Sequence, residues 1–139
     1  MTDVNNSEAP AEPVGERVDV SREIPGNPKQ VWATMMSTEG ADAFLGSGAV
    51  WGDKGHLWRT DGGRSGIIRS VHPNEEIRFS VRRDDDAPPS HVEILLAPSG
   101  DATTVDIHHT EITSGSDPAE LERKWSQALD TLASSQASA

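Results

Sequence analysis

The sequence predicts an α+β fold, in which a curled antiparallel sheet is covered on one face by a long C-terminal helix. Segments of alternating apolar and polar residues recur between turn signals from residue 49 to residue 112. Two short helical patterns precede most of these segments, and one amphipathic helical pattern at residues 116–133 follows them. Strands joined by short turns pair antiparallel, so one twisted sheet closed by the last helix is the economical arrangement.

The first elements are a strand and two helices. Residues 17–24 alternate between apolar and polar side chains, as in a half-buried strand. Asn27 can serve as an N-cap, and Gln30 three residues later completes a capping box, which predicts a helix to Met36. Residues 38–45 predict a second, shorter helix.

Six strands are predicted between the two short helices and the terminal helix. They are separated by turns rich in Gly, Pro, Asn and Asp. In chain order they cover residues 50–51, 56–60, 65–72, 77–81, 92–96 and 103–112.

The terminal helix begins after Asp117 and carries one apolar stripe. Leu121, Trp125, Leu129 and Leu132 recur at the spacing of one helix face. A single terminal helix must bury this stripe against the sheet. The space between helix and sheet is therefore where a small molecule could bind.

Composition predicts one folded domain between two disordered ends. The chain has 139 residues, which is an ordinary length for one domain. Residues 1–16 contain four carboxylates, no Lys or Arg and few large apolar residues, so we expect an acidic disordered tail. Residues 134–139 predict a second disordered end, and the folding unit is residues 17–133.

Charge and residue usage exclude several classes of function. The formal net charge is -11, and removing the four carboxylates of the tail leaves about -7, which repels nucleic acid and anionic lipid. The sequence has no Cys, which excludes disulfides, thiolate metal sites and a cysteine nucleophile. It has no apolar run long enough to cross a bilayer and no secretory signal pattern, so we expect a cytoplasmic protein without membrane insertion.

The histidines do not have the spacing of a metal site. His108 and His109 are adjacent on a predicted strand, so their side chains point to opposite faces, and the other three histidines lie on separate strands. We therefore expect no metal and no cofactor. His109 shares a face with Val105 and Ile107, which predicts that its imidazole points inward.

Two interpretations of His109 remain open. An inward imidazole can orient a ligand or act as an acid or base near neutral pH, with Glu111 on the same face as a weak catalytic partner. The simpler interpretation, which we favour, is a buried histidine bonded to a hydroxyl or backbone group. For Trp58 and Trp125 a core role and a pocket role are equally open.

The order of several motifs carries a resemblance to a known superfamily. The motifs are Ile24-Pro25 before Val31-Trp32, then Gly66-x-Ile68-x-x-Val71-x-Pro73, then Thr103-Thr104-Val105-x-Ile107-x-His109 before Trp125-x-x-x-Leu129-x-x-Leu132. In this order they resemble the START-like (SRPBCC) helix-grip superfamily, and within it the branch homologous to the C-terminal domain of the activator of Hsp90 ATPase. The resemblance covers nearly all of residues 17–132. It implies a cavity between sheet and terminal helix, but no particular reaction, because the fold also hosts polyketide cyclase-like enzymes, hydrolases and co-chaperone modules.

We expect non-catalytic binding of a small apolar or amphipathic molecule in that cavity. The residues expected to line it are Met35, Trp58, Ile68, Phe79, Ile94, His109, Trp125 and Leu129. One alternative is a cyclase- or hydrolase-like enzyme that uses His109 with Glu111. A second is a co-chaperone-like interaction module, which the acidic surface and the missing companion domain make less attractive. We expect a monomer or a weak dimer.

Overall fold

The sheet of this protein is antiparallel throughout, which confirms the predicted α+β class. The computed structural model describes residues 16–84, 86–112 and 117–137. The strands are β1 (Glu16–Pro25), β2 (Leu57–Arg59), β3 (Ser65–His72), β4 (Glu76–Val81), β5 (Ser90–Ser99) and β6 (Ala102–Ile112). The helices are α1 (Pro28–Met35), α2 (Thr38–Phe44) and α3 (Pro118–Ala137). The strand order is β1-β6-β5-β4-β3-β2, so the first strand pairs with the last.

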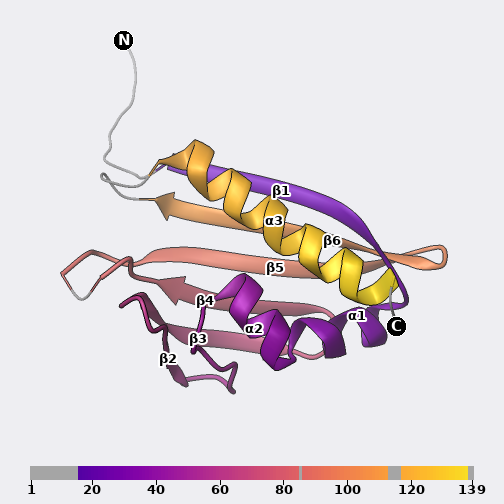
Figure 1. Ribbon diagram of the computed structural model, residues 1–139, viewed down its shortest axis with the longest axis horizontal. Helices are drawn as coiled ribbons and strands as arrows, with labels where there is room; N and C mark the ends of the chain where they lie inside the picture. The colour runs from indigo at the N-terminus through magenta and orange to yellow at the C-terminus, as the bar shows by residue number, and fades with distance from the viewer. Residues whose placement is uncertain (1–15, 85, 113–116, 138–139) are drawn as a thin grey trace, which may run out of the picture.

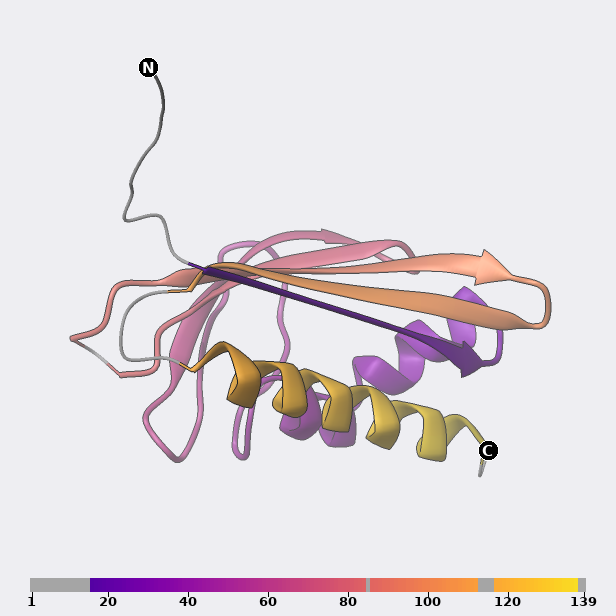
Figure 2. The ribbon, with the colours of Figure 1, turned by 90° about the horizontal axis from the view of Figure 1, so that it is seen from above.

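All three helices lie on one face of this sheet. Figure 1 shows α3 running along β1 and β6, with α1 and α2 beside it over the other half of the sheet. The perpendicular view in Figure 2 shows the same helices together on one side of the strands. The layers therefore follow the predicted helix-grip arrangement, with a covered inner face and an open outer face.

The capping box predicted for the first helix is present. The Asn27 side chain accepts a hydrogen bond from the Gln30 backbone N–H at 2.9 Å, and the Gln30 side chain accepts one from the Asn27 N–H at 2.9 Å. Each bond satisfies a backbone donor that helix geometry leaves without an internal partner. The second helix begins similarly, since the Ser37 hydroxyl accepts from the Gly40 N–H at 3.2 Å.

The terminal helix extends four residues beyond its predicted end. The amide of Gln136 donates to the Pro25 carbonyl at 3.0 Å, and its side-chain oxygen accepts from the Thr34 hydroxyl. The Ser135 hydroxyl donates to the Glu39 carboxylate at 2.9 Å. These bonds attach the last turn to the rest of the domain. Residues 134–137 are therefore helical, whereas the sequence predicted a disordered end from residue 134.

The predicted disordered tail meets the fold at Glu16, which is the first residue of β1. Residues 1–15, which make up the rest of that tail, and residues 138–139 lie outside the described residues.

The predicted strand at Val50–Trp51 is wrong. The Trp51 indole N–H donates to the Met35 carbonyl at 2.8 Å, and its ring packs edge-on against Phe79 at 5.5 Å between centroids. The Met35 carbonyl is one of those that the C-terminus of α1 leaves unbonded. Trp51 thus caps a helix, and the next strand is shorter than the predicted residues 56–60.

The alternation of β6 breaks near its end, and this break overturns one prediction. β6 has one residue more than β1 between the pairs Val18–His109 and Glu16–Ile112, and Glu111 has a φ of 56°. A residue in this left-handed region is typical of a β-bulge, which turns the side chains after it to the other face. Glu111 is therefore exposed and Ile112 is buried, so Glu111 does not share the inner face with His109.

A single apolar core fills the space between the inner sheet face and the helices. Trp58 and Trp125 are its two largest fully buried side chains. Trp58 packs edge-on against Phe79 with ring centroids 6.1 Å apart, and Trp125 lies 6.3 Å from Phe44 of α2. Aromatic pairs of this geometry add stabilisation to that of the buried area.

Gly66→Ala is expected to destabilise the sheet, because Gly66 of β3 has no room for a side chain. A Cβ at this position would lie 1.8 Å from the Ser80 backbone oxygen and 2.7 Å from two ring atoms of Trp58. The substitution should lower the free energy of unfolding by about 2 kcal/mol or more, because the backbone of β4 has to move. Urea denaturation measures this change.

Gly62→Ala is the matched control for this experiment. A Cβ at Gly62 would find its nearest neighbour, the Thr60 hydroxyl, 3.9 Å away. We expect a change within about 0.5 kcal/mol. Equal stabilities of the two variants would contradict the close approach at Gly66.

Candidate functional site

A pocket of about 220 Å³ lies at the end of the sheet where α3 begins. Its walls come from the first turns of α3, the connection between β4 and β5, and the turn between β2 and β3. The lining residues are Arg64, Val81, Arg83, Ala87, Pro88, Ser90, His109, Asp117, Glu120 and Leu121. We call this space the mouth pocket. It combines an apolar wall with several charged and polar groups, as small-molecule sites do.

His109 is the predicted lining residue that reaches the mouth pocket. Its Nδ1 accepts a hydrogen bond from the Trp125 indole N–H at 3.1 Å, and its Nε2 lies 2.7 Å from the Ser90 hydroxyl oxygen. An indole N–H is only a donor, so Nδ1 is the unprotonated nitrogen and Nε2 carries the hydrogen. Nε2 therefore donates to Ser90, whose hydroxyl donates in turn to the Val81 carbonyl at 3.3 Å.

The environment of His109 keeps it neutral. Burial is the main cause that lowers its pKa to about 4, and the positive charges of Lys124, Arg64 and His91 contribute to that shift. The imidazole is 3 % exposed. At neutral pH the ring is therefore an oriented, uncharged hydrogen-bonding group.

This arrangement does not provide a base for Ser90. A histidine that activates a serine must accept the hydroxyl proton on a free nitrogen lone pair. The hydrogen on Nε2 occupies that position, and the Trp125 N–H occupies Nδ1. Glu111 does not contribute either, because the bulge places its side chain outside the inner face, 3.9 Å from His91.

The other predicted lining residues lie deeper in the protein. Met35, Trp58, Ile68, Phe79, Ile94, Trp125 and Leu129 all belong to the core cluster and are at most 2 % exposed. In the part of the chain that the structure describes, the Trp58 indole N–H has no hydrogen-bond partner. That these residues line a ligand cavity stays a prediction.

Two cations beside the mouth pocket were not among the predicted site residues. Arg64 lies in the turn before β3, and its guanidinium donates to the Leu45 carbonyl at 3.3 Å. Lys124 of α3 donates to the Phe44 carbonyl at 3.3 Å, and its Nζ lies 4.0 Å from the centroid of the Trp125 ring. Burial lowers the pKa of both groups, that of Lys124 to about 7, where the charge of Arg64 adds to the effect.

The sequence holds only a weak signal for these residues. Lys124 directly precedes Trp125, at the border of the apolar stripe, where the stem of a long side chain can be buried. Arg64 follows two glycines in a predicted turn, where a charged residue is ordinarily exposed. The register of β5 against β6 places Ser90 near His109, but this register cannot be predicted from the sequence of either strand alone.

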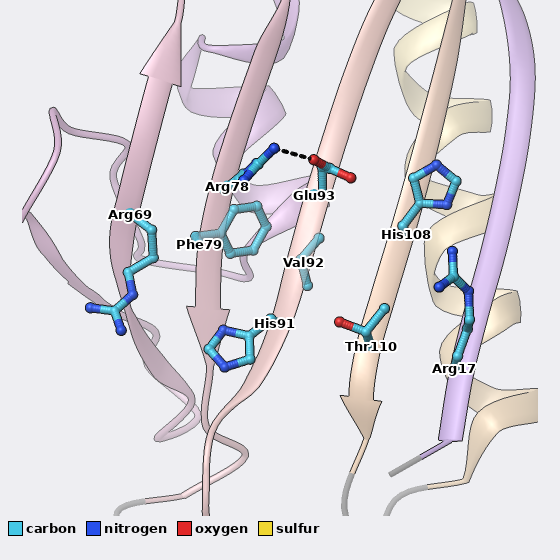
Figure 3. Close-up of a pocket in the computed structure, with 9 residues that line it drawn as sticks. All are labelled: Arg17, Arg69, Arg78, Phe79, His91, Val92, Glu93, His108 and Thr110. Atoms are coloured by element: carbon cyan, nitrogen blue, oxygen red, sulfur yellow. Dashed lines mark ion pairs between the residues drawn. The ribbon is translucent and has the colours of Figure 1, made fainter. Parts of the chain in front are cut away.

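A larger hollow of about 410 Å³ lies on the outer face of the sheet. Figure 3 shows that Arg69, Arg78 and His108 project from that face, away from α3. Arg78 pairs there with Glu93 at 2.9 Å (Figure 3). Arg17 and His108 both pair with Asp19 of β1. The hollow is open and lined by long polar side chains, so it is a weaker ligand site than the mouth pocket.

The described residues contain neither a cluster of metal ligands nor a helix that could cross a membrane. No group of three or more His, Asp and Glu there could hold a metal ion. No helix among them is long and apolar enough to cross a membrane.

The burial of neutral His109 should make stability depend on pH. Its folded pKa of about 4 lies below the unfolded value near 6.5, so the unfolded chain binds the proton first as the pH falls. Between pH 7 and pH 5 the free energy of unfolding should fall by about 2 kcal/mol more in this protein than in His109→Gln, which has no titrating group at this position. Urea denaturation at both pH values checks this, and equal losses would contradict it.

Lys124 should make stability depend on pH in the alkaline range. Its folded pKa of about 7 lies below the ordinary 10.5, so the unfolded chain holds the extra proton between these values and stability rises with pH. From pH 7 to pH 9 the protein should gain about 1–2 kcal/mol relative to Lys124→Met, allowing for partial exposure of the side chain. Urea denaturation at pH 7 and pH 9 measures this gain. An equal change of the free energy of unfolding with pH in both proteins would contradict it.

Solved structures share the fold at low sequence identity. The crystal structure of protein CV1439 from Chromobacterium violaceum has a TM-score of 0.73 and 20% identity, covering 86% of this chain and 96% of that one. CalU16 from Micromonospora echinospora has a TM-score of 0.70 and 23% identity, covering 84% and 71%. The solution structure of the Aha1 dimer from Colwellia psychrerythraea has a TM-score of 0.71 and 16% identity, covering 86% and 94%. At these identities the likeness shows the fold alone.

A comparison with family models identifies the family. No curated protein matches the chain significantly. The model described as "Activator of Hsp90 ATPase homolog 1-like protein" matches residues 26–135, which is most of the chain and confirms the predicted resemblance. This protein belongs to the family of activator of Hsp90 ATPase homolog 1-like proteins.

Proposed function

We propose that this protein binds a small amphipathic molecule in the mouth pocket, between the sheet and the first turns of α3, without converting it. The observation that carries the proposal is the polar part of the pocket lining. There His109 and Ser90 form a hydrogen-bonded chain with a fixed direction, at the inner end of a pocket with apolar sides. An apolar space with a few oriented polar groups is the usual composition of a binding site.

The size of the pocket limits the ligand. A volume of about 220 Å³ is below the roughly 300–1,000 Å³ of pockets for drug-sized molecules. The apolar wall is formed by Leu121, Val81, Ala87 and Pro88. These dimensions support a ligand with one or two rings, whose flat body lies on Leu121 and whose polar end lies among the polar groups of the pocket.

The two other candidate functions have less support. Catalysis by His109 lacks a free nitrogen lone pair to accept a proton, as described above. A co-chaperone-like contact needs an exposed apolar patch, and the described residues expose three large apolar side chains, Val50, Leu57 and Ile67. Leu57 and Ile67 lie opposite each other in the β2–β3 pair, but so few exposed apolar side chains are normal on a protein surface and do not favour a protein partner over a ligand. The monomeric or weakly dimeric state stays a prediction.

Titration with a two-ring amphipathic probe, 2-naphthamide, tests the proposal. Tryptophan fluorescence should change, because Trp125 is bonded to His109, and amide chemical shifts should move at Ser90, His109 and Leu121. Leu121→Ala should weaken binding about 3- to 10-fold, since it removes apolar contact area worth roughly 1 kcal/mol.

Gln127→Ala is the matched control on the same helix. Gln127 is exposed and does not line the mouth pocket. We expect it to bind the probe as the unaltered protein does. Shift changes confined to other regions, or none at saturating probe, would overturn the proposal.

A further inference from the structure

We propose that the polar end of the ligand is an anion, most simply a carboxylate, and that Arg64 binds it. This inference rests on the proposed function of the mouth pocket and names the chemical class of its ligand. It is carried by the hydrogen bonds that the Arg64 guanidinium makes and by those that it leaves open.

Arg64 lines the pocket, and towards the described residues its guanidinium uses little of its hydrogen-bonding capacity. A guanidinium has five N–H donors, and one nitrogen, Nη1, donates to the Leu45 carbonyl at 3.3 Å. Within the described ranges, 16–84, 86–112 and 117–137, no carboxylate lies within 4.0 Å of this side chain. A half-buried arginine normally has an acidic partner, and its planar fork fits a carboxylate with two parallel bonds.

Lys124 adds a second positive charge behind Arg64. Its Nζ is held between the Phe44 carbonyl and the face of Trp125, and the Arg64 charge helps to lower its pKa to about 7. The Arg64 charge thus disfavours the protonated form of Lys124, and the two cations repel each other. A negative group between or beside them removes that repulsion, so the site is electrostatically prepared for an anion.

A purely structural role accounts for part of this arrangement. Phe44 and Leu45 end α2, and helix C-termini attract cations to their unbonded carbonyls. One bond from each side chain is sufficient for that role. Arg64 also lines the mouth pocket, and the bond to Leu45 uses one of its nitrogens, Nη1.

The acidic groups of the pocket do not neutralise Arg64. The Asp117 carboxylate accepts the Ala119 N–H at 3.0 Å and caps α3. Asp117 directly precedes α3 and Glu120 lies in its first turn, and neither is within ion-pair distance of Arg64. They occupy the α3 side of the pocket, so the anion is expected on the side of Arg64 and His109. The net charge of -11 supplies no general attraction for anions, and any preference for them must come from this site.

The test compares two probes of the same shape, 2-naphthoate and 2-naphthamide, on three proteins. The unaltered protein should bind the carboxylate at least about 10-fold more tightly than the amide, as expected for a charge-assisted bidentate pair. Arg64→Gln should bring the ratio close to one, with amide binding unchanged. Arg69→Gln is the matched control, because it removes the same charge from the outer face of the sheet and should keep the ratio.

The outcomes separate this inference from the proposed function. Amide binding without a preference for the carboxylate overturns the anion site and leaves the proposed function in place. A preference that survives Arg64→Gln also overturns it, whereas binding of neither probe overturns both proposals. If Arg64→Gln does not fold, Arg64→Lys decides in its place: a reduced or lost preference supports the inference, because lysine lacks the bidentate fork, and an unchanged preference contradicts it.

Discussion

The structure depends on the contact of Trp125 with the sheet. The apolar stripe of α3 must be buried, and Trp125 lies at its centre, 1 % exposed. The ring packs near Phe44 and below Lys124, which links α3 to the end of α2. Its N–H fixes the tautomer of His109, and through that tautomer the direction of the bonds to Ser90 and the Val81 carbonyl. One indole thus connects α3 to β6, β5 and β4, and the geometry of the mouth pocket follows from it.

The titratable groups around this contact are not those that stability alone would favour. A neutral histidine with a pKa of about 4 and a lysine with a pKa of about 7 both lower the stability of the fold in part of the pH range. Elsewhere local polar groups are matched to the fold, as in the capping box of Asn27 and Gln30. Natural proteins accept destabilising groups chiefly where function requires them. The concentration of such groups at one end of the grip supports that end as the functional site.

Regular patterns could be predicted from the sequence, and interruptions of them could not. The alternation of β4 to β6 and the cap of α1 are local patterns, so they were predicted correctly. The alternation of β6 also predicted that His109 points inward. The bulge at Glu111 and the helix-capping role of Trp51 depend on a neighbouring strand or helix. The same holds for the pocket. Ser90, Arg64 and Lys124 come from a strand, a turn and a helix that are distant in sequence, and only the fold brings them to His109.

The position of the packed core also supports the mouth pocket as the proposed ligand site. The deeper residues that the sequence suggested as cavity walls fill one another's space, with Trp58 and Phe79 in edge-on contact. Opening that core for a ligand would separate side chains that each contribute roughly 1.5–3 kcal/mol through burial. The mouth pocket exists without such a cost, because α3 runs along β1 and β6 and not over β4 and β5 (Figure 1). A small ligand at Leu121 and His109 can therefore bind to the fold as it stands, and the core behind it holds His109 in place.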